Sequence, residues 1–445
     1  MRGGGVTAFA TAPASPAIAP LAGMARLNAP DRPPICVALS GGGDSLALLH
    51  LAKAWADRAG RTLAALTVDH ALQPQSGGWT RFAAERASRL GVTHRPLTWL
   101  GDKPTTGLSA AARNARHALL AQAARSIGAR VILLAHTADD LMEAEIMRRM
   151  GASAPSPRLW SPSPAWPQGR GAFLLRPLLD HRRADLRALL AGLGETWIDD
   201  PANDDPRFSR TLARRQLGDS PPQPAASSEL TPPSGWRAIR QGLGGELTAP
   251  RELLASAPRR LVGVLALCAA GTSRPPSPAS LDRIADRIAG RTAGRIAGAD
   301  FTCSLAGARI EGRGDWIRFC REAGEAARGG LLPADLPLGE SVFDGRFLMA
   351  TRRRGYRVVA LRGYAGRLSP AEQDRLKTIP APARGALPVL LAPSGERSCP
   401  VLASSEVVGV MPLGLARLQA ALGAVPDEAA TQLPGLGEPR GEVRA

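Results

Sequence analysis

A glycine-rich loop between an apolar run and an amphipathic segment carries the clearest chemistry in this sequence. The loop, called the glycine loop below, consists of Ser40, Gly41, Gly42, Gly43, Asp44 and Ser45. Consecutive glycines permit a tight turn and let an anion approach the backbone closely. A helix that begins here offers its N–H groups and the positive end of its dipole to a phosphate group. Asp44 would repel phosphate, so we expect it to hold Mg²⁺ that bridges the phosphates, while Ser40 and Ser45 supply hydroxyl donors.

Two better-known phosphate-binding patterns do not fit the glycine loop. Neither Gly-Lys-Ser nor Gly-Lys-Thr follows it, which excludes a Walker A loop. Leu46 stands where the third glycine of a dinucleotide-binding G-x-G-x-x-G motif would be. A glycine turn that only caps a helix is the structural alternative. The serines and the aspartate, placed directly after an apolar run, favour phosphate binding.

A second group of polar residues follows another apolar run. In LAHTADDLMEAE, residues 134–145, we expect a strand to end at His136 and a helix to begin near Asp139. Asp139 and Glu143 are four residues apart and share one helix face, and His136 and Asp140 have the same offset. Acids in a first helical turn can simply stabilise the helix dipole, which is the structural alternative. We expect Asp139, Asp140 and Glu143, called the acidic cluster below, to hold a metal ion or a cationic amine.

Two weaker features are candidates for lining the same site. Asp69 and His70 end another apolar run, although a single histidine is more often structural. Arg113 and Arg116 lie one helical turn apart in GLSAAARNARHALL, where a solvated helix face is the alternative. We expect at least one of these arginines to face the site.

The elements that must position these residues alternate along the chain. We expect strands at 35–39, 63–69, 92–100 and 131–136, and helices at 46–58, 79–91, 108–127 and 139–150. Strands that alternate with helices of this length predict an α/β fold with a parallel sheet covered on both faces. Right-handed crossovers then place the loops after residues 39, 69 and 135 along one edge of the sheet.

Composition shifts divide the chain. We expect a flexible tail at 1–30, a catalytic domain at 31–220, a linker at 221–235, a mainly helical domain at 236–325 and a small C-terminal α+β domain at 330–445. The proline-rich stretch 151–171 is predicted to be a flexible surface loop. For the Ala/Pro/Gly-rich beginning, a start codon at Met24 is the alternative to a tail, and no signal peptide is predicted.

Charge and cysteine usage limit the class of protein. The 445 residues carry 56 basic and 39 acidic side chains, a net charge of +17, which suits an anionic partner such as RNA. Because only three of the basic residues are lysine, arginine-rich coding is an alternative source of this charge. The charge is spread, with 25 basic against 18 acidic residues in 31–220 and 29 against 21 in 221–445. Five widely spaced cysteines argue against a disulfide framework and for a cytoplasmic protein, and no apolar run is long enough to span a membrane.

These motifs together resemble a known family. S-G-G-x-D-S after the first strand is the PP-loop of the N-type ATP pyrophosphatases, and the combination resembles the tRNA(Ile)-lysidine synthetase family. The matching segments cover about 35–217 in order: SGGGDSLALL, TVDHALQPQS, GLSAAARNARHALL, LAHTADDLMEAE, LLRPLLDHRRADLRALL and WIDDPANDDPRFSR. The resemblance implies ATP-dependent ligation of L-lysine to C2 of the wobble cytidine of an isoleucine tRNA. In this reaction the cytosine C2 oxygen is adenylated, pyrophosphate leaves, and lysine displaces AMP.

The resemblance also implies residue roles. The glycine loop would bind ATP, with Asp44 and Asp140 as ligands of Mg²⁺. Asp139 or Glu143 would lie nearer the substrate lysine, and Arg113 would contact nucleotide or tRNA. His70, His136 and Arg116 would line the site, and residues 236–325 would contact tRNA.

Several positions depart from the family pattern. The family usually has Gln at 141, Thr at 144 and Gly-Ser-Gly at 151–153, where this chain has Leu141, Ala144 and Gly-Ala-Ser. The usual Arg-Asn near the end of the domain is Arg-Thr at 210–211. Two alternatives therefore stay open. One is a thiolase-type PP-loop enzyme, although its usual C-x-x-C pairs do not occur in this sequence, and the other is a non-catalytic paralogue that binds nucleotide or tRNA.

Overall fold

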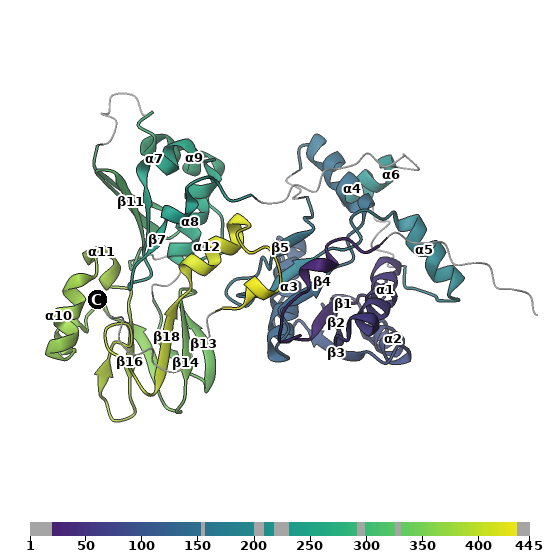
Figure 1. The fold of residues 1–445 in the computed structure, drawn as a ribbon, viewed down its shortest axis with the longest axis horizontal. Coiled ribbons are helices and arrows are strands. Elements are labelled where there is room, and N and C mark those ends of the chain that lie inside the picture. Colours follow the sequence, from purple (N-terminus) through teal and green to yellow (C-terminus); the bar gives the residue numbers. More distant parts are fainter. Residues whose placement is uncertain are drawn as a thin grey trace, which may run out of the picture. The chain divides into compact units, whose positions relative to one another are not determined.

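The computed structural model describes residues 20–152, 156–199, 209–217, 231–291, 299–324 and 331–433 (Figure 1). The chain forms two compact units. Unit 1 holds residues 1–163, 172–229 and 427–431, and unit 2 holds 164–171, 230–426 and 432–445. Each unit is considered by itself below.

Unit 1 is built on a six-stranded sheet in the order β3-β2-β1-β4-β6-β5. Its strands are β1 (Ile35–Ala38), β2 (Leu63–Asp69), β3 (Thr93–Thr98), β4 (Val131–Leu133), β5 (Trp160–Pro162) and β6 (Phe173–Leu175). The first four strands and β6 are parallel, and β5 is an antiparallel edge strand. Every residue of β1 and β4 is buried, as expected for strands in the middle of a covered sheet. The predicted parallel α/β fold is confirmed.

Four helices lie between consecutive strands of this sheet, and two more follow its last strand. They are α1 (Gly43–Ala59), α2 (Ser76–Arg89), α3 (Leu108–Ser126), α4 (Ala138–Arg149), α5 (Arg183–Gly192) and α6 (Ser209–Leu217). Strand order runs outward from β1 to β2 and β3 on one side and from β4 to β6 on the other. The loops after β1 and β4 therefore lie side by side at the point where the order reverses, which is where open α/β sheets bind ligands. The glycine loop follows β1 and the acidic cluster follows β4.

Two stretches expected to be flexible are packed where the structure describes them. In the predicted tail, Met24, Leu27 and Ala29 are buried, and the backbone N–H of Glu428 donates to Arg26 O. In the proline-rich stretch, Trp160 of β5 stacks on Phe173 of β6 with ring centroids 4.8 Å apart. The prediction of a flexible loop was wrong for β5, because pairing with β6 and aromatic burial outweigh the turn preference of the flanking prolines. Residues 1–19 and 153–155 lie outside the described residues.

Residues 427–431, far along the chain, belong to unit 1. Glu428 is fully buried and accepts hydrogen bonds from both terminal nitrogens of Arg61, at 3.0 and 2.8 Å. Arg61 also donates to the carbonyl groups of Leu27 and Pro33. A bidentate pair of this kind is directional, so it fixes the position of residues 427–431 on unit 1.

Unit 2 contains three antiparallel sheets. The five-stranded sheet has the order β7-β8-β11-β10-β9, with β7 (Arg240–Gln241), β8 (Leu247–Pro250), β9 (Phe301–Leu305), β10 (Ala308–Arg313) and β11 (Trp316–Arg321). The second has the order β12-β15-β16-β17, with β12 (Ala334–Asp335), β15 (Arg357–Ala360), β16 (Pro388–Leu391) and β17 (Arg397–Ser398). The third has the order β13-β14-β18, with β13 (Gly339–Phe343), β14 (Phe347–Thr351) and β18 (Val408–Pro412).

The helices of unit 2 pack against these sheets. They are α7 (Arg251–Ser256), α8 (Arg260–Ala270), α9 (Pro278–Ile288), α10 (Pro370–Thr378), α11 (Ala381–Arg384) and α12 (Gly414–Leu422). The stretch 236–325, expected to be mainly helical, contains α7, α8 and α9 and also the five-stranded sheet. Burial does not alternate regularly along β9, β10 and β11, so periodicity gave a weak strand signal there. Leu418 and Leu422 of α12 are buried in the core of this sheet, whereas the other two sheets contribute to a separate core cluster. Within the described ranges, no helix is long and apolar enough to cross a membrane.

Candidate functional site

The glycine loop is a backbone cradle between β1 and α1. Gly41 has a φ of +87°, and a Cβ there would lie 2.7 Å from Ile198 Cδ1. The Ile198 N–H donates to Gly41 O at 3.0 Å, which holds the loop against the segment that follows α5. The Ser45 hydroxyl donates to Gly42 O at 2.9 Å, and the Ser40 N–H donates to the Ser45 hydroxyl at 3.1 Å. Helix α1 starts at Gly43 with no side-chain cap, so its first N–H groups can serve an anion.

The acidic cluster lies at the start of α4. The Thr137 N–H and hydroxyl both donate to Asp140 Oδ2, at 2.7 and 3.0 Å, in a capping box that orients this carboxylate. Asp139 and Glu143 are also buried, and the Glu143 side chain is only 1% exposed. Leu141 and Ala144, two departures from the family pattern, are buried between these acids.

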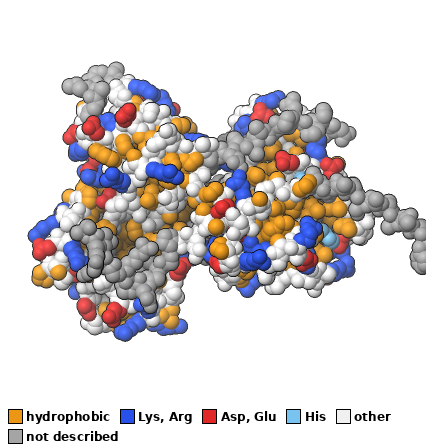
Figure 2. Space-filling model, in the orientation of Figure 1, with side chains coloured by type: hydrophobic (Ala, Val, Ile, Leu, Met, Phe, Trp, Pro, Cys, Tyr) orange, Lys and Arg blue, Asp and Glu red, His pale blue; other side chains and the backbone are white. Residues whose placement is uncertain are grey.

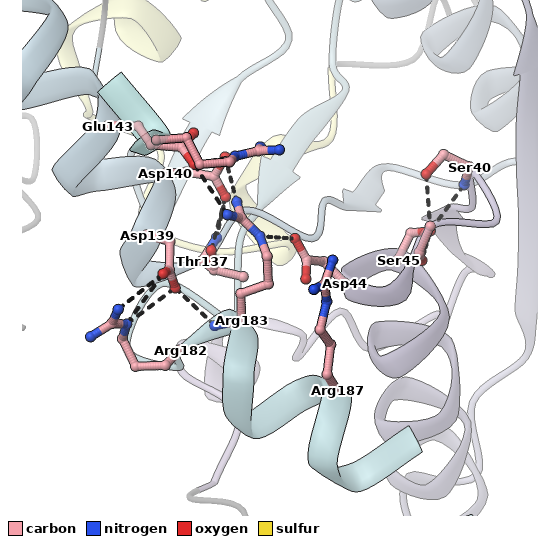
Figure 3. A network of polar contacts seen from close by, with 12 residues as sticks. Ser40, Asp44, Ser45, Thr137, Asp139, Asp140, Glu143, Arg182, Arg183 and Arg187 are labelled. Atoms are coloured by element: carbon pink, nitrogen blue, oxygen red, sulfur yellow. Dashed lines mark hydrogen bonds and ion pairs between the residues drawn. The ribbon is translucent and has the colours of Figure 1, made fainter. Parts of the chain in front are cut away.

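Arginines of α5 and α6 compensate these buried carboxylates (Figure 3). Arg183 Nε donates to Asp44 Oδ2 at 3.1 Å, and Nη1 of the same side chain donates to Glu143 Oε1 at 3.1 Å. Its Nη2 lies 3.9 Å from Asp140 Oδ1. Arg182 pairs with Asp139 at 3.1 Å, and Arg214 pairs with Glu143 at 3.0 Å. One guanidinium, that of Arg183, therefore joins the glycine loop to the acidic cluster.

These contacts shift the protonation equilibria in the expected directions. Burial alone would raise the pKa of Asp139, but hydrogen bonds from the Arg183 N–H and the Arg182 side chain, with the charges of both arginines, lower it below its ordinary value. Burial alone would lower the pKa of Arg183, but Asp44 and Glu143 outweigh burial and raise it. Asp139 and Arg183 are therefore held in their charged forms.

Arg182, Arg183 and Arg214 are not among the site residues predicted from the sequence. The segment HRRADLR, residues 181–187, contained the signal, because two adjacent arginines precede a helix in a stretch that otherwise matches the family. In an arginine-rich chain this signal is weak. Residues 200–208 of WIDDPANDDPRFSR lie outside the described residues, and the side chain of Arg210 is not described.

Two adjoining cavities open at this edge of the sheet. The smaller, of about 260 Å³, is lined by Asp44, Asp140, His136 and Arg183, together with most of the glycine loop. The larger, of about 430 Å³, lies by the ends of β1 and β2 and is lined by Asp69, His70 and Trp79 among others. Ser40, Gly42 and Arg116 line both cavities. The structure thus places the predicted residues Ser40, Asp44, Asp140, His136, His70 and Arg116 around one connected space.

The two arginines predicted on α3 differ in position. Arg116 lines both cavities and has no ion-pair partner among the residues that the structure describes, whereas Arg113 is exposed and lines neither. Burial, and then the charge of Arg113, lowers the pKa of Arg116. An unpaired, partly buried guanidinium is well suited to bind an anion. Arg116 is therefore the stronger candidate of the two.

The two predicted histidines, His136 and His70, each line one of the two cavities. His136 Nδ1 lies 3.2 Å from Arg176 Nε and accepts its hydrogen bond. Burial, followed by the charges of Arg113 and Arg158, lowers the pKa of Arg176 to about 10. His70 packs edge-on against Trp99, with ring centroids 6.0 Å apart, and its pKa is lowered by burial and then by Arg116. The linings of the two cavities include four arginines and four aspartates, so the walls carry both signs of charge.

A magnesium ion fits this site only as a partner of bound phosphate. The described residues contain no cluster of three or more His, Cys, Asp or Glu side chains that could hold a metal ion by themselves. Mg²⁺ commonly takes one or two carboxylates and completes its shell with phosphate oxygens and water. Asp44 and Asp140 line the same cavity as the glycine loop, which satisfies that requirement.

Comparison with known proteins defines the class. Residues 22–220 match the family model of the PP-loop domain, so the glycine loop is a PP-loop. A tRNA(Ile)-lysidine synthase from Caulobacter vibrioides is 46% identical over 372 residues, which cover 83% of this chain and 87% of that protein. The chain belongs to the tRNA(Ile)-lysidine synthase family, which confirms the predicted resemblance.

Other relatives match a smaller part. A tRNA(Ile)-lysidine synthase from Hyphomonas neptunium is 44% identical over 195 residues, covering 42% of this chain and 52% of that protein. Among solved structures, the U34-tRNA thiolase NcsA from Methanococcus maripaludis is similar at 15% identity with a TM-score of 0.36, over 43% of this chain and 66% of that chain. At that level the structural likeness supports no functional argument.

The glycine loop yields a test of its backbone. Gly41→Ala should lower the free energy of unfolding by about 1–3 kcal/mol, because alanine would have to adopt a strained positive φ against Ile198. Gly42→Ala is the matched control, since its φ is −71° and a Cβ would meet only atoms 3.6 Å or more away. Its cost should stay below about 1 kcal/mol, the usual range for an N-cap change. Urea unfolding of both variants measures the difference, and equal losses would contradict the described loop.

Proposed function

We propose that this chain is a ligase that joins L-lysine to C2 of the wobble cytidine of an isoleucine tRNA, with ATP converted to AMP and pyrophosphate. The observation that carries the proposal is that the PP-loop and Asp140 of the acidic cluster line one cavity, at the strand-order reversal of a chain in the tRNA(Ile)-lysidine synthase family, whereas Asp139 and Glu143 lie behind it and line neither cavity. The carbon–nitrogen bond, the adenylated intermediate and the cytoplasmic location are parts of this proposal.

The two cavities suit different parts of the ATP molecule. The glycine loop, with its backbone N–H groups and two serine hydroxyls, suits the phosphates. The larger cavity, lined by Leu66, Val68, Leu72 and Trp79 among others, suits the flat and partly apolar adenine ring. Asp44 and Asp140 would hold Mg²⁺, which supplies positive charge to the phosphates when it is bound.

In the first step the C2 oxygen of cytosine attacks the α-phosphorus of ATP. An oxygen–phosphorus bond forms to the tRNA, and the bond between the α-phosphorus and the bridging oxygen breaks, so that pyrophosphate leaves with that electron pair. Negative charge accumulates on the phosphate oxygens, and donors already in place stabilise it without reorganisation. The N–H groups at the start of α1 and the guanidinium of Arg116 are among the donors that border this space.

In the second step the lysine amine attacks C2, and AMP leaves with the C2 oxygen. The amine must lose a proton to become a nucleophile, which a nearby carboxylate can accept. Asp139 and Glu143 are the carboxylates proposed for the lysine side. Both are already paired with arginines in this structure, so the ammonium group would have to share or displace those partners.

The tRNA supplies the polyanion that the net charge of +17 suits. On the face shown in Figure 2, Lys and Arg side chains are distributed among hydrophobic and acidic ones rather than gathered in one patch. We propose that residues of unit 2 contact the tRNA away from the reacting base.

A non-catalytic paralogue, suggested by Leu141 and Ala152, is the competing outcome of the activity test.

The activity test uses purified protein, isoleucine tRNA transcript, ATP, Mg²⁺ and L-lysine, followed by nucleoside analysis of the tRNA. We expect lysidine in the wild-type reaction and a rate at least about 100-fold lower for Asp44→Asn, because a charge that acts on the phosphates is lost. Asp57→Asn is the matched control on the same helix, since Asp57 is 61% exposed and pairs only with Lys53 among the described residues. Folded wild-type protein that forms no lysidine would refute the proposed function.

Separate assays of the two reaction steps distinguish the roles proposed for the three acidic residues. Asp140→Asn should slow pyrophosphate release in single-turnover reactions without lysine, because Asp140 lines the phosphate cavity. Asp139→Asn or Glu143→Gln should instead raise the lysine concentration needed for half-maximal lysidine formation, by about tenfold for one lost ion pair. If all three variants lose both steps equally, or lose neither, this division of roles is wrong.

A further inference from the structure

Arg183 occupies a position that a cation would otherwise take. Its side chain is 16% exposed and lies between Asp44, in the glycine loop, and the acidic cluster (Figure 3). Nε and Nη1 donate to two different carboxylates, each at 3.1 Å, and Nη2 faces a third, Asp140, at 3.9 Å. Asp44 and Asp140, the two carboxylates proposed for Mg²⁺, are thus on the same guanidinium.

A guanidinium and a divalent metal cannot both sit between these carboxylates. They compete for the same carboxylates, and the two positive charges repel each other at this short range. With Arg183 in place, three arginines already offset most of the charge of the four carboxylates, so the site offers less to a metal ion alone. The described residues also lack a ligand set of three or more acids or histidines that could displace the arginine.

Bound nucleotide changes this balance. Arg183 lines the same cavity as the glycine loop, so phosphates bound there bring new negative charge to its guanidinium. Guanidinium groups bind phosphate oxygens well and often in bidentate fashion. An arginine that exchanges a carboxylate for phosphate releases that carboxylate for the metal.

We propose that Arg183 is a resident counter-cation that keeps divalent metal off Asp44 until nucleotide binds, so that metal enters the site only together with ATP. The proposal rests on the proposed use of ATP and Mg²⁺, and it makes Arg183 a positioning residue. A purely structural role is the alternative, in which Arg183 only stabilises the packing of α5 against α1 and α4.

Metal binding without turnover distinguishes the two roles. Mn²⁺ serves as the probe, and the free ion is counted by electron paramagnetic resonance in the presence and absence of α,β-methylene-ATP. Wild-type protein should bind Mn²⁺ at this site only with the nucleotide. Arg183→Met should bind Mn²⁺ without nucleotide at least about tenfold more tightly than wild type, because a competing charge has been removed.

Arg182→Met is the matched control. Arg182 precedes Arg183 and also covers a buried carboxylate, but its partner is Asp139, and it does not line the smaller cavity. Its Mn²⁺ affinity without nucleotide should equal that of wild type. The double variant Asp44→Asn/Arg183→Met should lose the gained affinity, which would locate the new binding at Asp44.

Equal Mn²⁺ affinity of wild type and Arg183→Met without nucleotide would overturn the proposal, as would nucleotide-independent Mn²⁺ binding at Asp44 in the wild type. If Arg183→Met does not fold, Arg183→Gln replaces it. The amide keeps hydrogen-bond donors but carries no charge, so Mn²⁺ affinity must still rise above that of wild type, and no rise refutes the proposal. The lysidine assay is independent, so wild-type protein that forms lysidine while the Mn²⁺ result fails would leave the proposed function standing.

Discussion

The guanidinium of Arg183 joins two parts of the chain that the reaction needs side by side. It pairs with Asp44 at the start of α1 and with Glu143 on α4, while Arg182 pairs with Asp139 next to it. Four carboxylates gathered at one sheet edge would repel one another, and buried charges are tolerated only when they are compensated. The acidic cluster can therefore stand beside a phosphate-binding loop only because α5 brings arginines between them.

The sheet topology supplies the frame for this arrangement. Because β1 and β4 are adjacent at the reversal of strand order, the glycine loop and the acidic cluster face each other across one crevice. Ile198, which follows α5, holds the loop through its hydrogen bond to Gly41. Helix α5 and the segment that follows it thus position both the arginine that pairs with the carboxylates and the glycine loop. Arg116 of α3 completes the site, because its guanidinium lines both cavities.

The sequence alone was enough to predict the position of the groups that lie at strand ends. It was not enough to predict the position of groups that depend on tertiary packing. Periodicity located β1 and β4, so the glycine loop and the acidic cluster could be placed on one edge. The pairing of Asp44 with Arg183 spans 139 residues and leaves no local pattern, so it could not be predicted. Arg113 and Arg116 were indistinguishable by spacing, and only packing shows that Arg116 reaches the cavities. In unit 2 the sequence indicated helices and strands at 330–445, but the pairing of the strands into three sheets depends on contacts between distant segments and left no local pattern.

The most direct test of this account is a crystal structure of the protein with Mg²⁺ and α,β-methylene-ATP. The account predicts the triphosphate on the N–H groups of residues 40–45, the metal on Asp44 and Asp140, and Arg183 moved from Asp44 to a phosphate oxygen. A nucleotide bound away from the glycine loop would contradict the assignment of the site. An unbroken ion pair between Arg183 and Asp44, with the metal bound elsewhere, would contradict the role given to this arginine.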